Sequence, residues 1–167
     1  MPKIGILSDT HGSLPDSVSD FFAGCDEIWH AGDVGNRTVL EQLASIANVR
    51  AVHGNIDGQD VRHVANDHTF FICGGKRVLM KHIGGRPGAY TPETREQIRS
   101  LRPDIFVCGH SHILLIKFNK KDNLLHINPG AAGSSGFHKM ITLLRFQINE
   151  GNISAMELWE KPRKQAT

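Results

Sequence analysis

Short apolar runs separated by polar turns fill the first third of the chain and predict a parallel β-sheet with covering helices. The runs at 4–8, 27–30 and 49–52 each have the length of a buried strand. Apolar residues spaced three and four apart between them predict two helices, one starting near Pro15 and one capped by Asn36. An alternation of strand and helix of this kind is typical of parallel sheets.

The pattern changes further along, where paired apolar runs flank short polar turns. Such pairs predict β-hairpins over residues 70–82, 114–127 and 141–159. Thr91 followed by Pro92 is a typical helix start, and this helix is expected to end near Leu101, before a strand at 104–108. We therefore expect an α/β fold with two sheets in a single domain that spans residues 1–167.

The composition is typical of a globular protein and does not point to a particular binding partner. The chain is 40% hydrophobic and 22% charged, and its net charge of +2 gives no strong signal for nucleic-acid binding. No apolar run approaches membrane-spanning length, and the first strand is too short for a signal peptide, so we expect a cytoplasmic protein with no membrane contact. Three cysteines without a CxxC pair indicate free thiols. The sequence leaves open whether the chain forms a homo-oligomer.

Side chains that can bind metals follow five of the predicted strands. They are Asp9 and His11, then Asp33, Asn55, His82, and finally His110 and His112. In open α/β sheets, ligands bind in the crevice at the carboxyl ends of the strands, so we expect these seven side chains to line one site.

The two last histidines of this set lie one residue apart, in the stretch Cys108-Gly109-His110-Ser111-His112. In extended backbone, residues i and i+2 point the same way, so both imidazoles are expected to face the site. A His-x-His pair alone is a weak signal, and it gains weight here from the other five side chains.

Four imidazoles, two carboxylates and an amide oxygen exceed what one tetrahedral ion needs. They suit two divalent transition metal ions about 3.5–4 Å apart, bridged by a carboxylate. Mixed nitrogen and oxygen ligands favour such ions over calcium or magnesium. Manganese is the expected ion, with nickel, iron, cobalt or zinc as alternatives. Hydrolysis of a phosphoester is the chemistry that such a pair of ions favours.

The same residues resemble a known family. In order, Asp9-x-His11, Gly32-Asp33, Gly54-Asn55-x-Asp57, His82 and Gly109-His110-x-His112 are similar to the five motifs of the calcineurin-like metallophosphoesterase superfamily. The short length and Asn128-Pro129-Gly130 resemble its small subfamily of bacterial and archaeal phosphodiesterases, which is related to the retromer subunit Vps29.

The resemblance implies a four-layer α/β/β/α sandwich of two mixed sheets flanked by helices. It implies a metal-dependent phosphodiesterase that acts on a small phosphoester or nucleotide-like substrate. The alternative that it leaves open is a non-catalytic scaffold that binds a protein partner in the manner of Vps29.

The resemblance also divides the seven ligands between two metals, with Asp33 bridging them. The first metal would take Asp9, His11, Asp33 and His112, and the second would take Asp33, Asn55, His82 and His110. Asp33, Asn55 and His82 are accordingly the candidate catalytic residues. The nucleophile would be a water or hydroxide between the metals.

Two positions depart from the family pattern. Many members carry a histidine directly after the asparagine of the third motif, where this chain has Ile56, so the proton donor for the leaving group is unassigned. The fourth motif is often His-Gly-His, and here only His82 matches.

We also interpret several residues besides the seven candidate ligands. Arg86 and His53 are candidate substrate contacts or ordinary surface side chains. Asp57 is expected to orient a loop or a ligand by hydrogen bonding. His30 is interpreted as strand packing. The remaining histidines are interpreted as surface or structural: His63, His68, His126 and His138.

Overall fold

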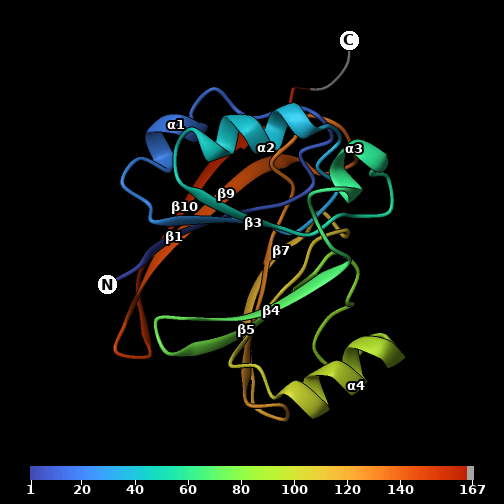
Figure 1. The fold of residues 1–167 in the computed structure, drawn as a ribbon, viewed down its shortest axis with the longest axis vertical. Helices are drawn as coiled ribbons and strands as arrows, with labels where there is room; N and C mark the ends of the chain where they lie inside the picture. The colour runs from blue at the N-terminus through green and yellow to red at the C-terminus, as the bar shows by residue number, and fades with distance from the viewer. Residues whose placement is uncertain (165–167) are drawn as a thin grey trace.

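The computed structural model describes residues 1–164, which form two five-stranded sheets with helices on their outer faces (Figure 1). The first sheet has the order β10-β9-β1-β2-β3, and its strands are β1 (Lys3–Leu7), β2 (Glu27–His30), β3 (Asn48–Ala51), β9 (Met140–Asn149) and β10 (Asn152–Pro162). The second has the order β4-β5-β6-β8-β7, and its strands are β4 (His68–Cys73), β5 (Lys76–Lys81), β6 (Ile105–Val107), β7 (Leu114–Asn119) and β8 (Leu124–Pro129).

Both sheets are mixed. In the first, β1, β2 and β3 are parallel while β9 runs antiparallel to β1 and to β10. In the second, β5, β6 and β8 are parallel while β4 and β7 pair antiparallel at the two edges. The predicted α/β class with two mixed sheets is confirmed.

The helices complete a four-layer arrangement. They are α1 (Val18–Phe21), α2 (Arg37–Ala44), α3 (Gln59–Arg62) and α4 (Pro92–Leu101). Figure 1 shows α1, α2 and α3 together beside the first sheet and α4 at the opposite end of the molecule, beside the second sheet.

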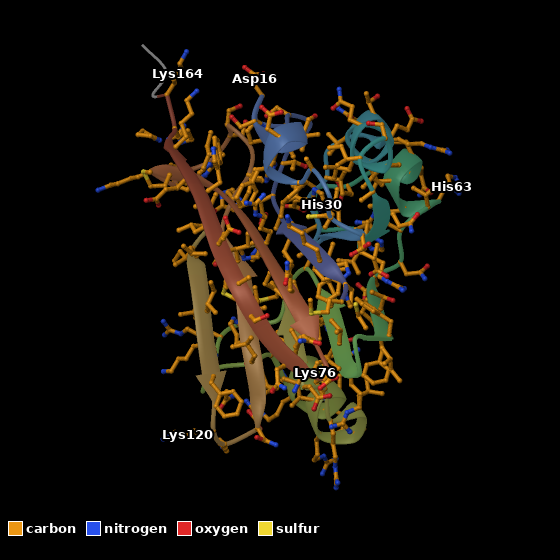
Figure 2. All side chains as sticks on the ribbon, turned by 90° about the vertical axis from the view of Figure 1, so that its left-hand side faces the viewer. Asp16, His30, His63, Lys76, Lys120 and Lys164 are labelled. Carbon is orange, nitrogen blue, oxygen red and sulfur yellow. The ribbon has the colours of Figure 1, made fainter. Side chains whose placement is uncertain are left out.

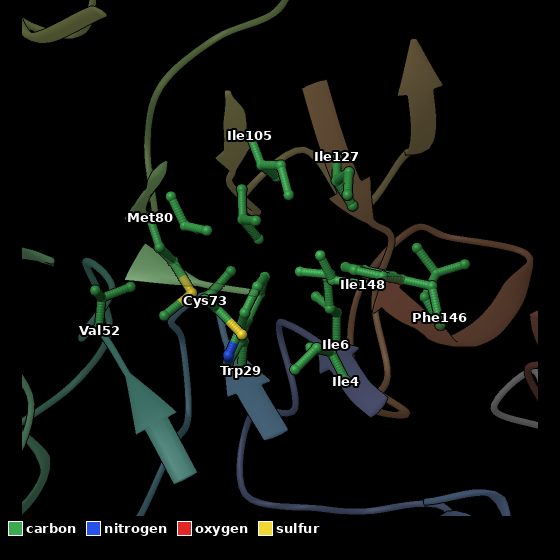
Figure 3. Packing of buried hydrophobic residues seen from close by; sticks show 14 residues of the cluster. Ile4, Ile6, Trp29, Val52, Cys73, Met80, Ile105, Ile127, Phe146 and Ile148 are labelled. Carbon is green, nitrogen blue, oxygen red and sulfur yellow. The ribbon is translucent and has the colours of Figure 1, made fainter. Parts of the chain in front are cut away.

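Three apolar clusters fill the spaces between the four layers. The largest lies between the sheets and joins Ile4 and Trp29 of the first sheet to Met80 and Ile127 of the second (Figure 3). A second cluster joins the first sheet to its helices, and a third packs Ile98 of α4 against the second sheet. Burying both faces of both sheets fixes the strand ends that carry the polar loops.

The predicted helix starts have their expected caps. The Asn36 side chain accepts a hydrogen bond from the backbone of Val39 at 3.2 Å. The Thr91 hydroxyl accepts one from the backbone of Thr94 at 3.3 Å, and Pro92 occupies the first turn.

Two short helices depart from the predictions. The predicted helix after Pro15 is a single turn, α1, and the single turn α3 was not predicted. Helices of four residues are too short to show a recognisable period in a sequence. In α3, Val61 is the buried residue. None of the helices in residues 1–164 combines the length and hydrophobicity needed to cross a membrane.

Candidate metal centre

Loops that follow β1, β2, β5 and β6 are tied to one another by backbone hydrogen bonds. The amides of Asp9 and His11 donate to the carbonyls of Gly32 and Asp33, both at 3.0 Å. Across the two sheets, the backbone amide of His110 donates to the Asp9 carboxylate at 3.1 Å. These bonds gather polar side chains from both sheets at one end of the molecule.

The backbone of these loops is unusual. Five of the predicted ligands have φ between +47° and +73°, a region that non-glycine residues rarely occupy; they are Asp9, His11, Asp33, His110 and His112. Such backbone persists where surrounding contacts hold it, and it concentrates at functional sites.

The prediction that His110 and His112 lie in extended backbone is therefore wrong. Both residues lie in the loop between β6 and β7, and the amide of Ser111 turns back to the carbonyl of Gly109 at 2.9 Å. Their imidazoles belong to two different groups of side chains, because the left-handed backbone at His110 and at His112 breaks the extended geometry that would align them.

The first of these groups, here called the first half-site, contains Asp9, His11 and His112, whose potential ligand atoms lie within 4.8 Å of one another. Asp9 Oδ1 lies 3.3 Å from His112 Nε2 and 3.9 Å from His11 Nε2. The other carboxylate oxygen of Asp9 accepts from the Ser8 hydroxyl at 2.7 Å, which leaves Oδ1 directed at the two imidazoles.

The second half-site contains Asp33, His82 and His110, which also lie within 4.8 Å of one another. Asp33 Oδ2 lies 3.2 Å from His82 Nε2 and 3.6 Å from His11 Nε2 of the first half-site. Asp33 is thus the carboxylate that reaches both groups. The other ring nitrogen of His82 donates to the carbonyl of Ala31 at 2.8 Å, so that Nε2 offers a lone pair.

Several buried polar atoms at this centre lack any hydrogen-bond partner. Within residues 1–164 they include Asp9 Oδ1, His11 Nε2 and His82 Nε2. Buried polar atoms of native proteins are almost always paired, and these three converge from the loops that follow β1 and β5, which belong to different sheets. Imidazole nitrogens and carboxylate oxygens are ligands for divalent transition metal ions, so the residues present fit two such ions.

The carboxylates are held in their charged form. Burial raises the pKa of Asp9, but the neighbouring imidazoles of His112 and His82, together with the Ser8 hydroxyl, outweigh it and keep the pKa below its ordinary value. For Asp33, burial is likewise outweighed by His82 and by the Ile56 amide, which donates to Oδ1 at 3.1 Å. Ionised carboxylates are the form that a metal ion requires.

Asn55 and Asp57 follow β3 on the Asp33 side of the centre. Asn55 is exposed, and it stands between Gly54, where a Cβ would lie 2.0 Å from Asp33 Oδ1, and Ile56. The Asp57 carboxylate is buried and accepts from the amides of Gly54, Val34 and Gly35 at 2.8, 3.1 and 2.8 Å. Asp57 thereby joins the loop after β2 to the loop after β3.

His138 is a site residue that the sequence did not reveal. It is buried, and its Nε2 lies 2.8 Å from the carbonyl of Gly133, which can only accept, so Nε2 carries the proton. Burial lowers the pKa of His138, and the neutral ring therefore presents a lone pair at Nδ1. His112 Nδ1 lies 3.2 Å away and must donate. The lone pair of His112 is then at Nε2, facing Asp9.

The loop that carries His138 is fitted around this hydrogen bond. A Cβ at Gly136 would lie 2.5 Å from His112 Nδ1 and 3.0 Å from His138 Nδ1, and φ at Gly136 is +134°. Arg163 holds the loop from outside, with its Nε 2.7 Å from the carbonyl of His138. No motif or periodicity marks residues 133–138 in the sequence. The role of His138 is therefore apparent only from the folded structure.

His30 does more than pack a strand. It is fully buried, unlike the exposed His63 (Figure 2), and burial lowers its pKa to about 4. The Gly32 amide donates to His30 Nδ1 at 3.1 Å, so Nε2 carries the proton and donates to the Thr10 hydroxyl at 2.9 Å. That hydroxyl donates to the carbonyl of Val34 at 2.8 Å, which links the loops bearing Asp9 and Asp33.

The other histidines without a motif have ordinary positions. His68 is exposed, and His126 is buried with its Nδ1 2.9 Å from the Tyr90 hydroxyl.

The two candidate substrate residues line two different cavities that flank the second half-site. His53 lines a cavity of about 580 Å³ together with Asn55 and His82. Arg86 lines a cavity of about 550 Å³ together with His110. Arg86 is exposed in a loop, whereas His53 is held by the carbonyl of Ala65 at 3.0 Å and by Arg62 at 3.2 Å.

Comparison with known proteins places the chain in a family. Residues 2–151 match the calcineurin-like phosphoesterase superfamily domain. A probable metallophosphoesterase from Methanothermobacter thermautotrophicus is 30% identical over 136 residues, covering 77% of this chain and 76% of that protein. The phosphodiesterase MJ0936 from Methanocaldococcus jannaschii is 28% identical over 152 residues, covering 77% of this chain and 82% of that protein.

Solved structures share the fold. An archaeal phosphodiesterase superposes with a TM-score of 0.71 at 20% identity, over 94% of this chain and 99% of the other. Vps29 from Entamoeba histolytica, in a complex with zinc, superposes with a TM-score of 0.75 at 17% identity, over 97% of this chain and 99% of the other. At these identities the likeness is one of fold.

Proposed function

Because this chain belongs to the calcineurin-like phosphoesterase superfamily, we propose that it is a phosphodiesterase that works with two divalent transition metal ions. The observation that carries the proposal is the convergence of unpaired ligand atoms from the loop after β1 and the loop after β5: Asp9 Oδ1, His11 Nε2 and His82 Nε2. Two such ions, when bound, lower the pKa of water and neutralise charge on a phosphoryl group. The first half-site and Asp33 would hold one ion, and the second half-site with Asn55 would hold the other.

The chain's own residues then orient the reacting groups. Asp33 reaches both half-sites with one carboxylate oxygen, while the Ile56 amide fixes the other at 3.1 Å. Arg86 lies on the loop after β5 with an exposed guanidinium, which can bind a phosphate oxygen with two parallel hydrogen bonds.

The chain offers no histidine directly after Asn55, where Ile56 stands. Without a proton donor at this position, the departing oxygen leaves with its charge. We therefore expect phosphodiesters with acidic leaving groups, such as nitrophenols, to be the better substrates.

A direct test is hydrolysis of bis(p-nitrophenyl) phosphate by the purified protein with manganese, after chelation with EDTA, and after manganese is restored. We expect turnover that chelation abolishes and manganese restores, and weaker turnover of the monoester p-nitrophenyl phosphate. Absence of chelator-sensitive turnover with manganese, nickel, cobalt and zinc would contradict the proposal.

A second candidate function is a protein-binding scaffold. Large apolar side chains are exposed directly beside the predicted ligands or beside His138; they are Ile56, Ile83, Ile113 and Phe137. Exposed apolar groups of this kind often mark interaction surfaces. Stoichiometric co-purification of a protein partner, together with inert metal sites, would favour the scaffold over the enzyme.

A further inference from the structure

The two cavities that flank the second half-site differ in chemical character. They meet at Ile83, the residue after His82, which lines both. The cavity of about 580 Å³, here called the polar cavity, includes the charged side chains of Arg62, Lys81 and Glu93. The cavity of about 550 Å³, here called the apolar cavity, has walls of Ile83, Ala89, Ile113 and Leu115.

Three polar side chains that line the apolar cavity, those of Ser111, His126 and Asn128, already have hydrogen-bond partners within the protein. The Asn128 amide donates to the carbonyl of Gly109 at 3.1 Å and to the Ser111 hydroxyl at 3.0 Å, and its oxygen accepts from Gly130 at 3.0 Å. His126 is bound to the Tyr90 hydroxyl at 2.9 Å. Groups paired in this way do not call for a polar ligand, so the cavity is suited to an uncharged one.

Backbone hydrogen bonds fix the loop that lines one side of the cavity. The loop between β5 and α4 is closed by two backbone hydrogen bonds, from Thr91 to the carbonyl of Gly84 at 3.0 Å and from Ala89 to the carbonyl of Arg86 at 2.8 Å. Among the described residues that line the cavity, Arg86 is the only lysine, arginine, aspartate or glutamate. Arg86 lies in the exposed loop, so its charge can pair with a phosphate group outside the cavity, while the cavity itself holds an uncharged group.

A phosphodiester carries two organic arms on one phosphorus atom. With the phosphorus at the metal centre, an arm directed past His110 enters the apolar cavity, and an arm directed past Asn55 and His82 enters the polar cavity. Ile113 is 67% exposed on the wall of the apolar cavity, and an apolar arm would remove it from water.

We propose that the apolar cavity binds an uncharged aromatic or alkyl arm of the substrate, so that the substrate is an asymmetric phosphodiester with one apolar and one polar arm. This assignment rests on the proposed phosphodiesterase function for its metal anchor. The occupant is part of the substrate because the cavity opens onto a predicted metal ligand, His110, and the loop tip supplies a cation for the phosphate.

The test compares two phosphonates, phenylphosphonate and methylphosphonate, at an alkaline pH where both are dianions, by calorimetric titration into the manganese-loaded full-length protein. We expect phenylphosphonate to bind about tenfold more tightly, since burying a phenyl-sized apolar group contributes roughly 1.5 kcal/mol or more. Ile113→Ser should reduce this ratio about fivefold. The matched control is Phe118→Ser, which changes an exposed apolar residue that is on β7 but does not line the cavity.

Equal affinity for the two phosphonates, or a ratio that Ile113→Ser leaves unchanged, would overturn the inference. The readout does not depend on turnover. A tenfold preference for phenylphosphonate without hydrolysis of any diester would contradict the proposed enzyme and support the apolar subsite. Hydrolysis of a diester without this preference would support the enzyme and contradict the subsite. Loss of a co-purifying protein in Ile113→Ser, with equal phosphonate affinities, would assign the surface to a protein partner instead.

Discussion

The two half-sites of the candidate metal centre contain similar ligands but differ in how exposed these ligands are. In the first half-site, Asp9 is fully buried and is bonded to the Ser8 hydroxyl and the His110 amide, and His112 is backed by His138. In the second half-site, His110 is exposed, and it lines two of the cavities at the mouth of the centre.

This difference indicates a division of labour. Each half-site has a carboxylate and an imidazole whose second polar atom is bonded to the protein. The third ligand is the half-buried His11 in the first half-site and the exposed His110 in the second, so we expect the first half-site to bind its ion more tightly. An exposed ligand leaves room for substrate, so the second half-site is the side from which the phosphoester would approach. The three changes below test this comparison, in order of decreasing effect.

Replacing Asp33 with alanine should weaken metal binding at both half-sites, because one oxygen of Asp33 lies near both of them, 3.6 Å from His11 and 3.2 Å from His82. We expect activity on bis(p-nitrophenyl) phosphate to fall about a thousandfold, comparable to the loss of a main electrostatic contact in an active site. Equilibrium dialysis with manganese should show that both sites bind more weakly.

The control is Arg86→Ala, which removes an exposed charge from the same mouth without touching either half-site. We expect about a tenfold loss, since an exposed charge-assisted hydrogen bond contributes about 1.5 kcal/mol. Equal losses in the two variants, with metal binding intact in both, would rule out the shared role of Asp33.

Replacing His138 with leucine should weaken the first half-site alone. The leucine cannot accept the Nδ1 proton of His112, so the imidazole is free to change tautomer and turn its lone pair away from Asp9. We expect the affinity of the tighter manganese site to fall about 10- to 100-fold, as is typical when the hydrogen-bond partner of a metal-binding histidine is removed.

Two-bond ¹H–¹⁵N NMR of the metal-free protein reads the His112 tautomer directly. The wild type should show the proton on Nδ1, and His138→Leu should show a mixture. His138→Gln, which keeps an acceptor, should restore part of the metal affinity, while the exposed His63→Leu should behave as wild type. A His112 proton on Nε2 in the wild type would refute the proposed orientation.

Most of the fold follows from local patterns in the sequence. The caps at Asn36 and Thr91 and the alternation of apolar strands and polar turns placed the long elements correctly, because burial on two faces imposes those patterns. The single-turn helices α1 and α3 were missed or overextended, since four residues display no clear period. The four-layer order came from the family resemblance, and the placement of β9 and β10 beside β1 was not predicted, because strand pairing between distant segments leaves no local pattern.

The site was less accessible to sequence reasoning in its details. The motif residues were found because each follows a strand, but the extended backbone assumed at His110 was wrong, since a positive φ in a non-glycine residue leaves no mark in the sequence. His138 and His30 were read as unremarkable for another reason. Their roles depend on contacts with His112 and Thr10, which are distant in the chain and are brought near only by folding.

The smallest expected effect is a gain at the open side of the second half-site. The Ile56 backbone is anchored to Asp33, and its side chain is 47% exposed, so position 56 presents its side chain beside the bridging carboxylate without a role in the core. Ile56→His should supply the proton donor that many superfamily members carry there. A general acid helps most when the leaving group is a poor one.

We therefore expect Ile56→His to raise kcat for a diester with a phenol or alcohol leaving group about tenfold, and to leave p-nitrophenolate release nearly unchanged. Ile56→Gln, which has a similar reach but no titratable proton, should match the wild type on both. The gain should disappear as pH rises through the pKa of the new imidazole, since only the protonated ring can donate. A gain of equal size on both substrates, or one that Ile56→Gln reproduces, would contradict a role in proton transfer. The gain would then come from altered polarity or packing at position 56 beside the second half-site.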